Sequence, residues 1–121
     1  MRELKETDLQ QAIIEMAVEA WRFRRVFYKA MSKLDAGESN RYMGQFAWFI
    51  KKVDNALTTA GMKIVDVERQ PYDIGMALTP LNIDDFDPDD RLFVEQLIEP
   101  IIMDDEKVLK TGTAMLGRYE E

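Results

Sequence analysis

The stretch from Leu92 to Gly117, near the end of the chain, reads LFVEQLIEPIIMDDEKVLKTGTAMLG. Two runs rich in Val, Ile, Leu and Phe, at 92–98 and 108–116, flank a short apolar piece and an acidic turn. This enrichment, interrupted at Pro100 and Gly112, predicts short β-strands joined by tight connections. We expect this β-rich part to carry the binding surface, and the helical part upstream to present it.

Between residues 61 and 91 the β pattern continues in shorter pieces. We expect strands at 63–68, 76–78 and 81–83, a turn at 70–73 and a charged loop at 84–90. The last two strands are separated by Thr79-Pro80, because proline cannot donate to a ladder. Five or six short strands are too few to close a wide barrel, so a small open sheet or sandwich is predicted.

The first 60 residues contain none of the four prolines and predict two long helices. Apolar residues recur at every third or fourth position from Leu9 to Leu34 and again from Met43 to Leu57. A short polar connector at 35–40 predicts that the helices form an antiparallel hairpin. The prediction is an α+β protein, with a helical hairpin over 1–60 and a small, mostly antiparallel β domain over 61–121.

Particular residues are expected to begin and end the helices. Thr7 is the expected cap of the first helix, Gly37 its C-terminal stop, and Ser39 the cap of the second, which ends at Gly61. Gly44 lies inside the second helix, where glycine costs about 1 kcal/mol relative to alanine. We therefore expect the two helices to cross closely at Gly44.

The predicted helices carry more apolar surface than they can cover for each other. Their aromatic residues would leave an exposed patch on a lone hairpin. We expect a homodimer in which two hairpins form a four-helix bundle, with coverage by the chain's own β domain as the alternative. The residues expected at the dimer contact are Phe23, Phe27, Phe46, Phe49 and Ile50.

The 121 residues include no cysteine and no histidine. Disulfides, thiol chemistry, Cys/His zinc sites and histidine acid–base catalysis are therefore excluded. The charged start, MRELKETDLQ, is unlike a signal peptide, and no apolar run approaches the length that crosses a membrane. We expect a cytoplasmic protein that does not bind a membrane.

Charge is unevenly placed along the chain. Residues 1–60 hold ten Lys/Arg and eight Asp/Glu, whereas residues 61–121 hold six and fifteen. An acidic half of this kind repels phosphate backbones, so we expect no nucleic-acid partner. A basic protein surface is the natural complement, and the alternative is that the acidity serves solubility alone.

The loop at 84–90 is the candidate metal site, because clustered carboxylates suit hard cations. Counted as a calcium-binding loop from Asp85, it offers Asp87 and Asp89 at the right spacing. Asp90 then stands where the sharp turn needs glycine, and Gln96 stands where a bidentate Glu is needed. No other catalytic group accompanies the carboxylates, and the six glycines form no phosphate-binding pattern. We expect a protein that is not an enzyme and needs no metal or cofactor.

The order of the motifs is informative. A heptad-like helical part precedes Gly-Met-Lys-Ile-Val-Asp at 61–66, Gln-Pro-Tyr-Asp at 70–73 and VEQLIEPIIMDDEKVLK at 94–110. This order resembles the GrpE family, the nucleotide exchange factors of DnaK-type chaperones. In that family a helical stalk and a four-helix bundle dimerise the protein. A compact β domain carries a Pro-Phe-Asp-Pro turn and late valine-rich strands.

The resemblance implies a function and a set of binding residues. The β domain would press against the nucleotide-binding domain of a DnaK-like ATPase and favour its open, nucleotide-free form. Pro71, Tyr72 and Asp73 resemble the family's turn, although Ile74 replaces its second proline. The expected partner-binding residues are Pro71, Tyr72, Asp73, Glu95, Glu99 and Lys110. The alternatives are a dimeric scaffold or adaptor without an exchange role and a small acidic regulator that neutralises a basic protein.

Overall fold

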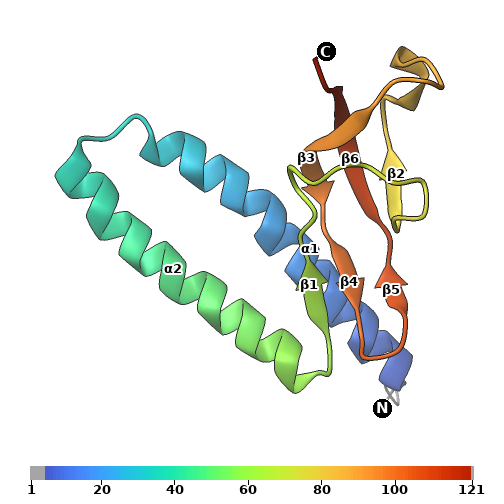
Figure 1. The fold of residues 1–121 in the computed structure, drawn as a ribbon. Coiled ribbons are helices and arrows are strands. Elements are labelled where there is room, and N and C mark those ends of the chain that lie inside the picture. Colours follow the sequence, from blue (N-terminus) through green and yellow to red (C-terminus); the bar gives the residue numbers. More distant parts are fainter. Residues whose placement is uncertain (1–4, 121) are drawn as a thin grey trace. The chain divides into compact units, whose positions relative to one another are not determined.

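The computed structural model of the protein describes residues 5–120. The chain divides into two compact units, one that ends at Lys63 and one that begins at Ile64. Two helices come first and six short strands follow, so the predicted α+β fold with an N-terminal helical hairpin is confirmed (Figure 1).

The hairpin consists of α1 (Glu6–Met31) and α2 (Ala36–Thr59), which run in opposite directions (Figure 1). The cap position of α1 is Lys5, whose side chain makes no capping bond, and Thr7 already lies inside the helix. Thr7 as the cap is therefore wrong. Glu6 and Asp8 in the first turn favour the positive end of the helix dipole instead.

The connector between the helices is shorter than the sequence suggested. Asp35 is the cap of α2, and its Oδ1 accepts a hydrogen bond from the Glu38 N–H at 2.9 Å. Gly37 and Ser39 lie within the first turn of α2, so neither performs its predicted role. The carboxylate of Asp35 caps the helix because it satisfies one of the N–H groups that have no partner inside the helix.

The end of α2 agrees with the predicted helix stop at Gly61. Gly61 has a φ of 75°, its N–H donates to the Thr58 carbonyl at 3.0 Å, and the Met62 N–H donates to the Leu57 carbonyl at 2.8 Å. These two bonds form a Schellman motif, which ends the helix. Gly44 has open space around the position of a Cβ atom, so the predicted close helix crossing there is wrong.

The second unit is built around a bent two-stranded ribbon. One side of the ribbon is β3 (Leu92–Glu99) followed by β4 (Ile101–Met103), and the other is β5 (Val108–Lys110) followed by β6 (Gly112–Arg118). β3 pairs antiparallel with β6, and β4 pairs antiparallel with β5. The two halves belong to different three-stranded sheets, of order β2-β6-β3 and β1-β4-β5 (Figure 1). The remaining strands are β1 (Lys63–Val65) and β2 (Leu78–Pro80).

The bend lies where the sequence shows its interruptions. Pro100 is fully buried and has no N–H to donate to a ladder. Opposite it, a Cβ atom on Gly112 would lie 2.8 Å from the Glu99 carbonyl oxygen, so only glycine fits. The run at 108–116, predicted as one β-rich piece, is therefore divided between β5 and β6.

A tight turn closes the ribbon at 104–107. The Asp104 N–H donates to the Lys107 carbonyl at 3.0 Å. The Asp104 carboxylate accepts hydrogen bonds from the N–H groups of Glu106, at 2.8 Å, and Lys107, at 2.7 Å. These N–H groups lower the pKa of Asp104, because they stabilise the charged carboxylate.

The segment before the ribbon differs from its prediction. A single strand, β2, replaces the two expected at 76–78 and 81–83, and residues 83–85 form a 3-10 turn. β2 pairs parallel with β6 at the edge of its sheet, where proline is tolerated. The Asn82 side chain then exchanges two hydrogen bonds with the Leu116 backbone, both at 2.9 Å, and takes over the pairing where β2 ends.

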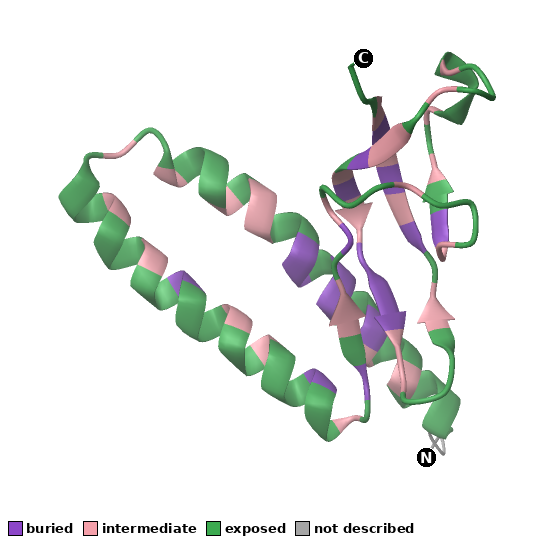
Figure 2. Ribbon diagram, viewed as in Figure 1, coloured by how far each residue is buried: buried purple, intermediate pink, exposed green. Residues whose placement is uncertain are grey.

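The β2-β6-β3 sheet buries one of its faces. Ala114 and Leu116 of β6, and Val94 and Leu97 of β3, are almost completely buried (Figure 2). Val94 and Leu97 are three residues apart because the register shifts between Val94 and Gln96. This bulge keeps both side chains in the core and leaves Glu95 exposed.

Candidate partner-binding surface

The outer face of the β2-β6-β3 sheet contains three of the six predicted partner-binding residues, namely Pro71, Glu95 and Glu99. Side chains alternate across a strand, so Thr113, Met115 and Gly117 lie on the face opposite to the buried Ala114 and Leu116. The three outer positions are half-buried. A partner that contacts this face would meet small or flexible side chains on β6.

Pro71 and Tyr72 extend this sheet beyond β3. Pro71 forms a β-bridge with Phe93, and the Tyr72 N–H donates to the Leu92 carbonyl at 2.9 Å. A turn was predicted to begin within 70–73, and these two residues still lie in extended backbone before it. The turn begins at Asp73, whose Oδ1 accepts a hydrogen bond from the Gly75 N–H at 3.1 Å.

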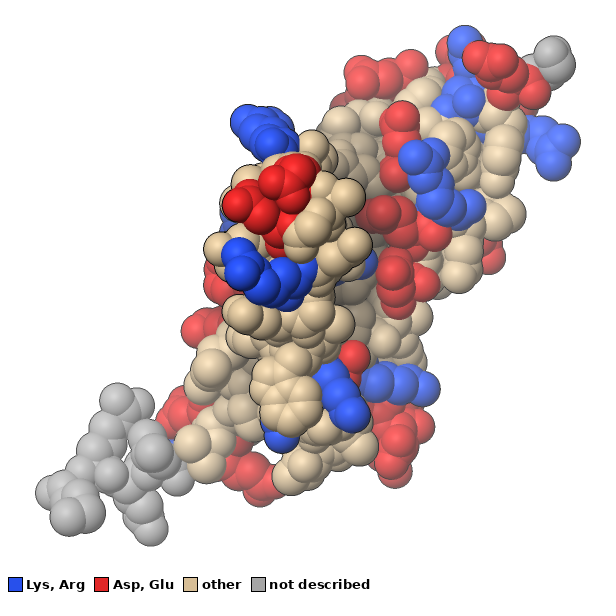
Figure 3. All heavy atoms as spheres, turned by 90° about the vertical axis from the view of Figure 1, so that its left-hand side faces the viewer, with Lys and Arg blue, Asp and Glu red and all other residues tan. Residues whose placement is uncertain are grey.

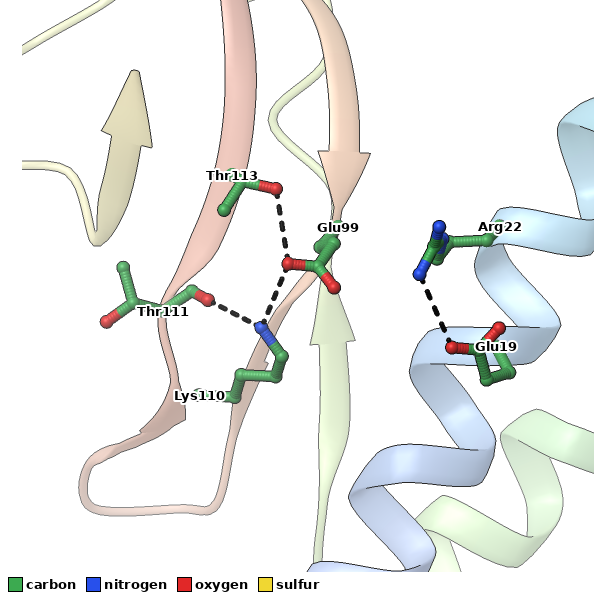
Figure 4. Close-up of polar contacts among 6 residues, drawn as sticks. All are labelled: Glu19, Arg22, Glu99, Lys110, Thr111 and Thr113. Atoms are coloured by element: carbon green, nitrogen blue, oxygen red, sulfur yellow. Dashed lines mark hydrogen bonds and ion pairs between the residues drawn. The ribbon is translucent and has the colours of Figure 1, made fainter. Parts of the chain in front are cut away.

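Glu99 and Lys110 meet at the bend of the ribbon (Figure 4). The Lys110 Nζ lies 3.6 Å from the Glu99 Oε1 and donates to the Thr111 carbonyl at 3.0 Å. The Thr113 hydroxyl donates to the same Glu99 oxygen at 3.3 Å. The Lys110 and Glu99 side chains are 27% and 28% exposed, so the pair is partly shielded from water. The cluster holds the carboxylate in one orientation, which suits recognition of a partner.

Glu95 lies nearer the other end of the face. A Cβ atom on Gly117 would lie 2.8 Å from the Phe93 ring and 3.3 Å from the Glu95 carboxylate, so both side chains lie over this glycine. The structure thus places Glu95, Glu99 and Pro71 on β3 or its direct neighbour. The Asp73 carboxylate is used by its own turn.

Sequence reasoning missed a ladder of four side chains at the end of this sheet, which we call the Arg–aromatic ladder. The guanidinium of Arg69 lies 6.0 Å from the centre of the Phe93 ring, and that of Arg91 lies 5.9 Å from the centre of the Tyr119 ring. The two rings are 5.0 Å apart. The residues come from three separate segments, so only the strand register could have revealed the ladder.

In the helical unit, the predicted dimer residues divide into two groups. Phe27 and Phe46 stack on each other within the hairpin at 4.3 Å, and Phe46 is buried. Phe23 and Phe49 are 50% and 44% exposed. Ile50 lines a groove of about 530 Å³ beside Phe46. Phe27 and Phe46 therefore hold the hairpin together, whereas Phe23 and Phe49 remain open to a partner.

An apolar groove of about 170 Å³ lies between the two helices. Its lining is Ile13, Met16, Ala17, Ala20, Phe49, Val53, Ala56 and Leu57. Figure 3 shows uncharged areas between the charged side chains. The groove contains no polar side chain, so it suits an apolar occupant.

α1 carries an exposed stripe, which we call the α1 stripe and which borders the groove between the helices at Met16. Its members follow the three-four spacing of a coiled-coil seam and are Leu9, Ala12, Met16, Glu19, Phe23, Val26 and Ala30. Met16 is 74% exposed and Val26 is 63% exposed. Glu19 is the one charged member, and it pairs with Arg22 of the same helix at 3.4 Å (Figure 4).

The charged loop at 84–90 uses Asp90 for its own structure. The Asp90 carboxylate accepts a hydrogen bond from the Asp87 N–H at 2.9 Å and lies 3.9 Å from Arg118. Within residues 5–120, no group of three or more His, Cys, Asp or Glu is arranged to hold a metal ion. Over the same residues, neither helix is both long and apolar enough to cross a membrane.

Comparison with models of protein families, with curated proteins and with solved structures gave no match. A proposal for the function therefore rests on the contacts and charges of the β unit and of the hairpin.

Proposed function

We propose that the protein is a non-enzymatic co-chaperone. It binds the nucleotide-binding domain of a DnaK-like ATPase through its β unit and accelerates nucleotide release, as the resemblance to the GrpE family implies. The main support is the position of the two segments that carry the resemblance. Pro71 lies beside Phe93 on β3, and Lys110 pairs with Glu99 where β3 ends, so both segments border one strand.

The mechanism needs no chemistry on the nucleotide. A protein that binds the open conformer of an ATPase more tightly than the closed one shifts the population toward the open form. The shift is limited by the difference between the two affinities. The role of Glu99 and Lys110 is to make oriented, charge-assisted hydrogen bonds that only one conformer of the partner can satisfy.

Stopped-flow release of a fluorescent ADP from a DnaK-like ATPase tests this proposal. We expect faster release with the protein present and about a tenfold weaker effect for Lys110→Gln, because a charge-assisted bond is lost. Lys63→Gln is the matched control, since it removes the same charge from an exposed position on β1, the opposite edge strand of the sheet that contains β5. If release is no faster at saturating protein, the exchange role is wrong and the scaffold alternative is favoured.

We also propose that the hairpin forms a homodimer through the α1 stripe, with the exposed Phe23 at its centre. A seam of this period that is exposed along one helix needs a second helix to cover it. Glu19 favours a second copy in antiparallel orientation. A parallel pair would place two Glu19 carboxylates opposite each other, whereas an antiparallel pair brings Glu19 toward Arg22 of the other copy.

Sedimentation velocity over a range of protein concentrations tests the dimer. We expect Met16→Glu and Phe23→Glu to produce monomers, because each places a charge inside the seam. Gln11→Glu is the matched control, since it adds the same charge at an exposed position outside the α1 stripe. Glu19→Leu is expected to tighten the dimer. A wild-type monomer at 100 µM would contradict the proposal.

A further inference from the structure

The Arg–aromatic ladder is fixed in place by the backbone. The Arg69 N–H donates to the Val94 carbonyl at 2.7 Å, and the Tyr119 N–H donates to the Arg91 carbonyl at 2.9 Å. Phe93 lies over Gly117, where no side chain competes with its ring. The backbone positions of the two arginines therefore follow from their pairing with the sheet.

The backbone of Arg69 is itself unusual. Within residues 5–120, Arg69 is the one non-glycine residue with a positive φ, at 72°. The left-handed region is unfavourable for a residue with a Cβ atom. Such outliers persist where the surrounding structure holds them, and they gather at binding sites. Here the conformation brings the Arg69 side chain to the ring of Phe93.

The charges at the ladder contrast with those of the rest of the unit. Residues 61–121 hold only six Lys/Arg against fifteen Asp/Glu, and three of the six are Arg69, Arg91 and Arg118. Arg118 is paired with Asp90. Across residues 5–120, no carboxylate lies within ion-pair distance, 4.0 Å, of Arg69 or Arg91. The guanidinium groups of Arg69 and Arg91 thus remain available to a ligand, although the unit is rich in carboxylates.

A guanidinium that contacts an aromatic ring only at a cation–π distance of about 6 Å keeps its in-plane N–H groups available. These groups match the geometry of a carboxylate and can bind it through two parallel hydrogen bonds. A hollow of about 620 Å³ next to Arg91 is lined by Asp90, Arg91, Arg118, Tyr119 and Glu120. Its two carboxylates and the acidic unit around it repel every anion, but least a ligand whose negative charges are few and separated, and most a polynucleotide, whose charge is continuous.

We propose that the Arg–aromatic ladder docks an acidic segment of a protein partner that carries two or more Asp or Glu side chains. One carboxylate binds Arg69 and another binds Arg91, on the two sides of the Phe93–Tyr119 ring pair. The inference does not depend on the partner being an ATPase, because it follows from the two arginines and their surroundings.

Fluorescence anisotropy with the full-length protein tests the inference. The probe is a fluorescein-labelled 12-residue peptide of alternating glutamate and glycine. We expect saturable binding, a loss of at least fivefold in affinity for Arg69→Gln or Arg91→Gln, and a greater loss for the double variant. Lys107→Gln changes the net charge equally in the exposed turn that closes the ribbon, and we expect its affinity to stay within twofold of wild type.

Four results would overturn the inference. The first is no binding of the peptide at millimolar protein. In the second, Lys107→Gln weakens binding as much as Arg91→Gln, so that the net charge of the protein alone determines the affinity. In the third, a peptide of alternating glutamine and glycine binds equally well, so that carboxylates are not recognised. In the fourth, a labelled 12-nucleotide single strand binds more tightly and loses binding in Arg91→Gln, so that the occupant is a nucleic acid.

Discussion

Gly112 and Gly44 show how differently one residue type acts in the two units. A Cβ atom on Gly112 would meet backbone, which cannot move aside, whereas Gly44 has open space around it. Both glycines interrupt the sequence pattern of their elements. The difference between them arises from contacts with residues that are distant in the sequence. Gly112 is required by the close approach of Glu99 across the ribbon, and no local pattern of residues encodes that approach.

The two alanine substitutions therefore have opposite expected effects. Gly112→Ala should lower the free energy of unfolding by about 1–3 kcal/mol, the usual cost of overpacking a tight site. Gly44→Ala should raise it by about 0.5–1 kcal/mol, because alanine favours the helix over glycine. Urea denaturation followed by circular dichroism measures both. Equal effects of the two substitutions would contradict the described geometry.

Asp104 makes the stability of the ribbon depend on pH. Its folded pKa lies below the ordinary value of 3.8, so the carboxylate stabilises the folded state above that value. The stabilisation is lost as the pH falls through the lowered folded pKa. Asp104→Asn keeps an acceptor but does not titrate. The urea midpoint of wild type minus that of Asp104→Asn should therefore be larger at pH 7 than at pH 2.5, and a difference independent of pH would refute the assignment.

At the scale of elements, the start of α2 was misplaced for a reason that can be tested. Both Asp35 and Ser39 are good capping residues, and the sequence alone does not choose between them. The structure uses Asp35. Asp35→Ala should cost about 0.5–2 kcal/mol of stability, whereas Ser39→Ala, inside the helix, should change it by less than about 0.5 kcal/mol. Thermal unfolding of the two variants measures the difference.

The strands of the ribbon were predictable and the pairing of β2 was not. Alternation and the break at Pro100 are local signals, so the positions of β3 and β4 follow from composition. β2 is three residues long, contains Pro80 and pairs with a strand more than thirty residues away. The same non-local register creates the Arg–aromatic ladder, whereas Glu99 and Lys110 flank a hairpin and were within reach of sequence reasoning.

At the scale of the molecule, the change from helical to β pattern near Gly61 agrees with the boundary between the two units. The periodic pattern predicted the hairpin, but it did not reveal which apolar side chains hold the hairpin together. Phe27 and Phe46 belong to the contact between α1 and α2, and the exposed α1 stripe is a second seam offset around α1. In the sequence alone, these two neighbouring apolar stripes on α1 cannot be distinguished from one broad apolar face.

If the α1 stripe is a dimer contact, stability depends on protein concentration. Folding and association are then linked by mass action. Raising the concentration a hundredfold should raise the Tm of the wild type by about 3–6 °C. Phe23→Glu should show no such dependence, and Gln11→Glu should behave as the wild type. Differential scanning calorimetry at two concentrations measures the shift.

The edge formed by β2 limits how other chains can join this unit. Thr79 faces β6, so the N–H positions that point outward from β2 belong to Leu78 and Pro80. The first is used by the Met76 carbonyl, and the second has no hydrogen. An incoming strand would find no donor there, and the sheet is protected from growing into an aggregate along that side. A partner that adds a strand to this unit therefore cannot do so along β2.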